Sequence, residues 1–152
     1  MEQLIEQLKK ILGTNFVLYF KSHSFHWNVE GPDFAQYHDF LGDFYNSVWS
    51  QTDDIAEKIR MLDGYAPTSV GRMLELSAIE EITAIPTALV MFSELKRSNE
   101  TMIAELRVGI EVAEAAGEPA ISNFLQDLLD VWTIHIPNLK KKSKESKKKR
   151  NH

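Results

Sequence analysis

Apolar residues recur every three to four positions along most of the chain, a pattern that predicts long amphipathic helices. Four such stretches cover residues 2–28, 33 to about 62, 83–116 and 118–137. The breaks between and after them contain the helix-ending residues Gly31, Pro32, Asp63, Gly64, Gly117 and Pro137. We expect Pro86 in the first turn of the third helix. In the fourth, the spacing predicts a buried stripe that includes Trp132, Ile134 and Ile136.

The connection between the second and third helices is unusually long. Its twenty residues, APTSVGRMLELSAIEEITAI, are too many for a structureless loop in a compact bundle, so a short helix is expected near residues 72–77. A long crossover of this kind joins parallel neighbours. The sequence therefore predicts an all-α fold, a ferritin-like four-helix bundle with a short extra helix in the crossover.

Composition narrows the chemistry that the chain can perform. At 152 residues and 43% hydrophobic content, it is long and apolar enough for one domain. The absence of cysteine excludes disulfides, thiolate metal sites and a nucleophilic thiol, which leaves oxygen and nitrogen atoms as metal ligands. The first residues do not read as a signal peptide, and no run is apolar enough for a membrane span. We expect a cytoplasmic protein without a membrane partner.

Charge is divided unequally between the body and the end of the chain. Residues 140–152 carry eight of the seventeen basic residues and one acidic residue, a charge of +7, whereas residues 1–139 carry −12. We therefore expect a domain over 1–139 and a disordered lysine-rich tail over 140–152. Lysine runs are often merely solvated, and this one lacks aromatic residues for base stacking, so it is limited to sequence-independent phosphate contacts. The candidate DNA-contacting residues are Lys140, Lys141, Lys142, Lys144, Lys147, Lys148, Lys149 and Arg150.

Two histidines and two carboxylates suggest a metal site that one chain is unable to complete. Asp53 and Glu57 are four residues apart and share a helix face. His38 lies fifteen residues before Asp53 on the predicted helix, about 22 Å away at ~1.5 Å per residue. An antiparallel second copy, with a two-fold axis near Ser47 and Val48, would bring His38 to the partner's carboxylates. The alternatives are hydrogen-bonded core histidines, and carboxylates paired with nearby lysine and arginine.

The same residues resemble a known family. His26-Trp27-Asn28, a turn at Gly31, Phe34, His38, Asp53 and Ala56-Glu57 follow the spacing of the Dps proteins, the miniferritins that protect DNA during starvation. The resemblance covers nearly all of residues 1–139. It implies a hollow dodecamer that acts as a ferroxidase, an oxidoreductase that oxidises Fe(II), preferentially with hydrogen peroxide over dioxygen, and stores ferric iron. Zinc is expected to compete for such ligands without changing oxidation state.

By position, the resemblance assigns His26 and His38 to one subunit and Asp53 and Glu57 to the other, all as both catalytic and metal-binding residues. One departure stands out, because the family has an aspartate four residues after the second histidine, where this chain has Gly42. Either Gly42 loosens the helix so that Asp43 becomes a ligand, or one carboxylate is lost and the site is weakened.

Several other candidate residues have both a functional and an ordinary structural interpretation. Trp27 is a core or interface anchor, and by resemblance it also lies beside the iron site. His23 is a further ligand or an ordinary exposed histidine. The candidates for an iron-entry pore, or ordinary surface acids, are Glu118, Asp127 and Asp130. The leading functional hypothesis is iron oxidation and storage that protects DNA under oxidative stress. Its rivals are a DNA-compacting, nucleoid-associated shell and an inactive shell whose site decayed with Gly42.

Overall fold

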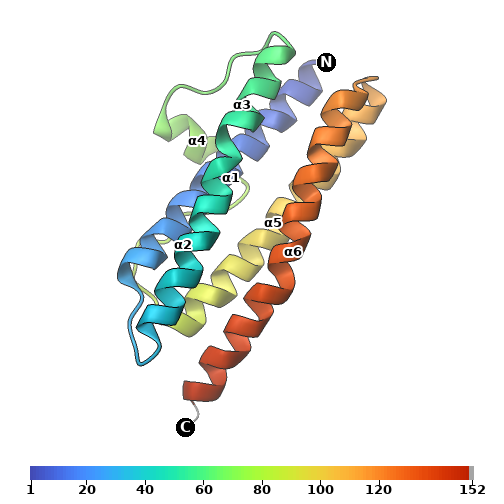
Figure 1. Ribbon diagram of the computed structural model, residues 1–152. Coiled ribbons are helices and arrows are strands. Elements are labelled where there is room, and N and C mark those ends of the chain that lie inside the picture. Colours follow the sequence, from blue (N-terminus) through green and yellow to red (C-terminus); the bar gives the residue numbers. More distant parts are fainter. Residues whose placement is uncertain (151–152) are drawn as a thin grey trace.

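The computed structural model describes residues 1–150, and every regular element in that range is a helix. The elements are α1 (Glu2–Asn28), α2 (Phe34–Ser50), α3 (Thr52–Met61), α4 (Val70–Leu76), α5 (Ala88–Ala115) and α6 (Pro119–Arg150). Figure 1 shows α1, α5 and α6 side by side with α2 and α3, which follow each other along the bundle, while α4 crosses the flank of α1. The predicted all-α ferritin-like bundle, with its short helix in the crossover, is confirmed.

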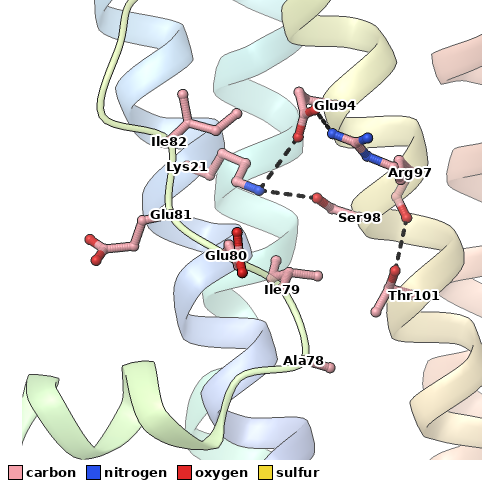
Figure 2. Close-up of a pocket in the computed structure, with 10 residues that line it drawn as sticks. All are labelled: Lys21, Ala78, Ile79, Glu80, Glu81, Ile82, Glu94, Arg97, Ser98 and Thr101. Carbon is pink, nitrogen blue, oxygen red and sulfur yellow. Dashed lines mark hydrogen bonds and ion pairs between the residues drawn. The ribbon is translucent and has the colours of Figure 1, made fainter.

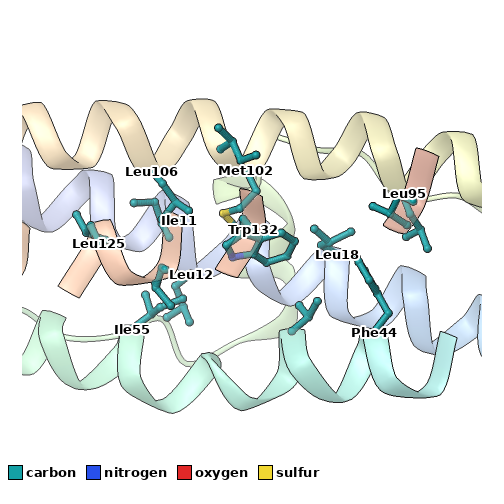
Figure 3. Packing of buried hydrophobic residues seen from close by; sticks show 14 of the residues in the cluster. Ile11, Leu12, Leu18, Phe44, Ile55, Leu95, Met102, Leu106, Leu125 and Trp132 are labelled. Carbon is teal, nitrogen blue, oxygen red and sulfur yellow. The ribbon is translucent and has the colours of Figure 1, made fainter. Parts of the chain in front are cut away.

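The core runs along the axis of the bundle and draws apolar side chains from every long helix (Figure 3). Leu18 of α1, Phe44 of α2, Leu95 of α5 and Trp132 of α6 are all buried. Burying a side chain of this size stabilises the fold by about 1.5–3 kcal/mol, so the shared apolar stripe accounts for the association of the helices. Among the residues described in the structure, no helix has an apolar stretch long enough to cross a membrane.

The predicted second helix is interrupted at Gln51, which corrects the expectation of one continuous helix to residue 62. At this position the Gln51 backbone N–H donates to Val48 O at 3.2 Å, a tighter turn than the α-helical pattern. The buried Asn15 side chain of α1 donates to Val48 O at 3.1 Å and to Thr52 Oγ1 at 3.2 Å. At this break, the Asn15 side chain of α1 is therefore inserted between the backbone hydrogen bonds of the neighbouring helix. The Gln51 side chain in turn accepts a hydrogen bond from Trp132 Nε1 at 2.8 Å.

The crossover is held against α1 at a glycine. A Cβ atom added to Gly13 would lie 2.7 Å from Met73 O and 2.9 Å from Leu76 Cβ, so α4 approaches α1 this closely because residue 13 has no side chain. The Ala78 backbone N–H then donates to Thr14 Oγ1 at 2.9 Å.

Two expectations at helix ends are corrected. Helix α5 begins at Ala88 with Thr87 as its N-cap, so Pro86 precedes the helix rather than occupying its first turn. Helix α6 does not end at Pro137 but continues to Arg150. It therefore includes residues 140–150 of the segment that was expected to be a disordered tail. Pro137 lacks the N–H that would bond to the Thr133 carbonyl, but both residues are exposed, so water can reach that carbonyl.

The buried stripe of α6 is narrower than predicted. Trp132 is fully buried, as expected, but Ile134 is 64% exposed, because the helix turns it away from the bundle. Beyond Pro137, Leu139 is again fully buried, and Lys142 Nζ lies 5.5 Å from the centre of the Phe40 ring of α2. The extended part of α6 therefore packs on α2. The side chains of Ile136, Lys149 and Arg150, and residues 151–152, lie outside the part that the structure describes.

Candidate metal centre

His26 near the end of α1 and His38 in the first half of α2 lie against each other. Their rings are stacked, with centroids 3.6 Å apart and planes 22° from parallel. Each ring is tied to the backbone of the other helix: His26 Nδ1 lies 2.7 Å from His38 O, and His38 Nδ1 lies 2.8 Å from His26 O. The turn at residues 29–33 reverses the chain and makes this crossed pair of hydrogen bonds possible.

These two bonds decide which ring nitrogen faces a ligand. A carbonyl oxygen only accepts hydrogen bonds, so each Nδ1 donates its N–H. In a neutral imidazole with Nδ1 protonated, the lone pair is on Nε2. The same backbone contacts that orient the rings therefore leave two Nε2 lone pairs for a cation, which is the arrangement that second-shell hydrogen bonds give to metal-binding histidines.

Gly42 lies directly beside this pair. A Cβ atom at position 42 would be 3.1 Å from His26 Cε1 and 3.3 Å from His26 Nδ1, so the His26 ring lies in the space that a side chain would need. The helix is continuous through this residue. The Asn46 side chain, one turn further on, donates a hydrogen bond from Nδ2 to Gly42 O at 2.9 Å. Gly42 thus does not loosen α2.

Asp43 lies away from the histidine pair. It lines a separate cavity of about 350 Å³ between α2 and α6, together with Phe44, His135 and Lys141. The pKa of His135 is lowered by its burial. Of the two alternatives for the departure at position 42, the arrangement in a single chain favours the loss of one carboxylate.

Asp53 and Glu57 lie on α3, beyond the break at Gln51, and both are exposed. Helices α2 and α3 continue in the same direction along the bundle (Figure 1). Because His38 lies in the first half of α2, the fifteen residues from His38 to Asp53 carry the carboxylates along the bundle away from it. Over residues 1–150, no group of three or more histidine, cysteine, aspartate or glutamate side chains is arranged to hold a metal ion. A single chain thus presents two histidines at one place and two carboxylates at another.

An aromatic cluster borders the histidine pair and was not predicted from the sequence. The His23 ring is stacked on Tyr45 at 3.8 Å, and His23 Nδ1 shares a 2.8 Å hydrogen bond with the Tyr19 hydroxyl. The pKa of His23 is lowered by burial and by the neighbouring His26. Trp27 lies 4.2 Å from His23, between ring centres, and Trp49 lies 4.7 Å from Tyr19. The four-residue spacing of 19, 23 and 27 on α1, and of 45 and 49 on α2, is the signal that would have revealed this cluster.

This cluster includes large apolar side chains on the surface. Trp27 is 56% exposed, Phe20 52% and Trp49 49%, and Phe20 contacts the edge of Trp27 with ring centres 6.1 Å apart. Trp27 is therefore not a core residue of a single chain. Adjacent exposed aromatic residues on one face are typical of a protein interface.

The remaining predicted residues lie on α6 or in the turn that precedes it. Glu118 lies at the turn between α5 and α6 and lines a small cavity there, while Asp127 and Asp130 are exposed on α6. In the lysine-rich segment, Lys142 is half-buried and lies 3.4 Å from Glu145. The lysines whose side chains are exposed are Lys140, Lys141, Lys144, Lys147 and Lys148.

Comparison with known proteins identifies the family. A model of the ferritin-like domain matches residues 5–144. DNA protection during starvation protein 2 of Bacillus anthracis is 33% identical over 124 residues, which are 82% of this chain and 85% of that protein. The crystal structure of antigen TpF1 from Treponema pallidum superposes with a TM-score of 0.89 at 30% identity, covering 94% of this chain and 92% of that one. Dps from Staphylococcus aureus superposes with a TM-score of 0.90 at 25% identity, over 94% and 96% of the two chains. The chain therefore belongs to the Dps family of the ferritin-like superfamily.

Proposed function

We propose that this protein is a ferroxidase and iron store whose active sites form between two copies of the chain. The observation that carries the proposal is the crossed hydrogen bonding of His26 and His38, because it leaves both Nε2 lone pairs available at a place where no carboxylate among residues 1–150 completes a site. Asp53 and Glu57 of a second copy supply the missing oxygen ligands. Imidazole and carboxylate ligands suit both Fe(II) and Fe(III).

Iron is the substrate of this reaction. Two Fe(II) ions each lose one electron, and one hydrogen peroxide with two protons takes up both electrons and becomes two water molecules. Gly42 leaves one ligand position without a protein carboxylate, which weakens iron binding but does not remove the histidines. Zinc competes for the same lone pairs and blocks oxidation, since it does not change oxidation state.

Assembly follows from the same arrangement. The exposed aromatic face of α1 and α2 adjoins the histidine pair, and a two-fold contact through it buries Trp27 and Trp49 while it joins the two half-sites. Because the chain belongs to the Dps family, we propose that such dimers assemble further into a dodecamer of roughly 200 kDa, twelve copies of a 17.4 kDa chain. A monomeric mass by light scattering at micromolar concentration would contradict it.

The sharpest test of the shared site is complementation between two inactive variants. His38→Ala and Glu57→Gln each remove one ligand, so each variant alone should lose fast oxidation of Fe(II) by peroxide while it remains assembled. When the two are co-expressed with separable tags, about a quarter of the sites in mixed particles pair an intact His38 with an intact Glu57. Ferric absorbance should then recover to about a quarter of the wild-type amplitude.

The control is a chain that carries both His38→Ala and Glu57→Gln, co-expressed as two copies with the same separable tags. No pairing of these copies contains an intact site. Recovery in mixed particles but not in this control supports an intersubunit site. If mixed particles are as inactive as the separate variants, the two residues do not form one shared site. If each variant alone retains fast oxidation, the residues are not ligands and the inactive-shell hypothesis is the better one.

A second candidate function is sequence-independent binding of DNA. The observation that favours it is the group of exposed lysines on the last turns of α6. These turns extend beyond the N-terminal end of α5 (Figure 1). Twelve such helices on one particle would bind a polyanion with high avidity although each contact is weak. The acidic body opposes this attraction, so binding should depend steeply on salt. The predicted cytoplasmic location stays a prediction.

A further inference from the structure

A polar cavity of about 360 Å³ lies on the opposite flank of α1, outside the proposed iron site. It opens to the surface and is bordered by α1, by the chain that follows α4 and by α5 (Figure 2). Lys21 of α1 points into it, and Glu94, Arg97 and Ser98 of α5 face Lys21 across it. Glu80 and Glu81, in the chain that follows α4, also line the cavity.

Lys21 is a buried amine with few partners. Its side chain is only 4% exposed. The ammonium group has three N–H donors, but it makes one long hydrogen bond, to Ser98 Oγ at 3.3 Å, and lies 3.9 Å from Glu94 Oε2. Glu94 also pairs with Arg97, so its charge is shared.

Burial and the nearby Arg97 charge lower the pKa of Lys21 from 10.5 to about 8, against the opposing effect of Glu80. At neutral pH a far larger fraction of this amine is therefore uncharged and nucleophilic than of a surface lysine. A cavity beside such an amine admits a small electrophile to it.

The charges around the amine decide which electrophile fits. Carbon dioxide would convert Lys21 to an anionic carbamate between the carboxylates of Glu80 and Glu94, and a bound anion would meet the same repulsion. An aldehyde instead gives a protonated imine, which keeps one positive charge on the nitrogen. The ion pair with Glu94 then survives the reaction.

We propose that Lys21 is a covalent modification site for small uncharged aldehydes. The Nζ lone pair attacks the carbonyl carbon, and the carbonyl oxygen takes up a proton to give a carbinolamine. The carbon–oxygen bond then breaks, a C=N bond forms, and the oxygen leaves as water. Overall, the ammonium and the aldehyde become a protonated imine and one water molecule, so charge is conserved and no oxidant or reductant is consumed.

The test uses the assembled wild-type protein with propanal, and sodium cyanoborohydride to trap the imine. Peptide mass spectrometry follows the labelling of each lysine, with the exposed Lys141 as an internal reference. At pH 7 the lower pKa raises the uncharged fraction roughly 300-fold over an ordinary lysine. Restricted access and weaker basicity reduce this advantage, and we expect Lys21 to be labelled about tenfold faster than Lys141.

Three comparisons make the result decisive. The labelling rate of Lys21 should level off above about pH 8, whereas the rate of a lysine with the ordinary pKa has no plateau at that pH. A dextran polyaldehyde, too large for the cavity, should label Lys141 and spare Lys21. Lys21→Arg should lose the fast phase of one label per chain, whereas Lys96→Arg, which changes a half-buried lysine of α5, should retain it. Labelling of Lys21 no faster than that of Lys141, or a fast phase that persists in Lys21→Arg, would overturn the proposal.

Discussion

Replacing His38 by asparagine separates the two roles that the structure gives to its ring. Asparagine places an amide Nδ2 where histidine has Nδ1, so it can still donate to the His26 carbonyl, which His38 Nδ1 approaches at 2.8 Å. It has no atom at the place of Nε2. His38→Ala removes both the hydrogen bond and the Nε2 lone pair, and it serves as the matched control.

The two variants should differ in stability but not in activity. Both lose the stacking of His38 on His26 and on Phe34, so that loss cancels in the comparison. The retained hydrogen bond contributes about 1 kcal/mol, the usual net value for a partly buried bond, and the lower helix propensity of asparagine offsets roughly half of it. His38→Asn should therefore be more stable than His38→Ala by about 0.5 kcal/mol. Because both lack the Nε2 ligand, both should slow the oxidation of Fe(II) by at least about 100-fold.

Stopped-flow absorbance of ferric iron, with two Fe(II) and one peroxide per site, measures the rate. Denaturant unfolding at one fixed protein concentration measures the stability, since assembly makes stability depend on concentration. Fast oxidation by His38→Asn would show that Nε2 is not the ligand. Equal stability of the two variants would show that the crossed hydrogen bond does not hold the helices at this point.

Three further variants test the ligand position at residue 42, the charge of the last residues and the packing of Trp132. Gly42→Asp should bind Fe(II) about tenfold more tightly than Gly42→Ala by calorimetry, because both add a Cβ against His26 but only aspartate adds a ligand, and equal affinities would show that the missing carboxylate is unimportant. Deleting residues 140–152 should abolish the gel shift of DNA at low salt without changing iron oxidation, whereas an unchanged shift would place DNA binding on the body. Trp132→Phe should destabilise the protein by about 2–4 kcal/mol in the same unfolding assay, since it leaves the buried Gln51 Oε1 without its donor and opens a cavity, and a loss below about 0.5 kcal/mol would contradict the importance of that bond.

The sequence by itself determined that the chain forms long helices and that a short helix lies in the long crossover. It also determined that His38 and Asp53 are too far apart in one chain to bind the same ion. Helix periodicity and breakers act over a few residues, so they are readable without a structure, and the helix of Val70–Leu76 lies where the length of the connection predicted it. The separation of His38 from Asp53 followed from the rise of a helix alone, and it required no knowledge of packing.

Only the tertiary structure decided how those elements meet. The break at Gln51 depends on Asn15, which is 36 residues away in the chain. Helix α6 continues through Pro137 because the carbonyl that the proline leaves unpaired is at the surface. The availability of the two histidine Nε2 lone pairs depends on backbone carbonyls twelve residues distant, and the contact of Lys21 across its cavity is with Ser98 of α5, 77 residues further along. Each of these features arises from a contact between residues far apart in the sequence, and a local pattern contains no information about such contacts.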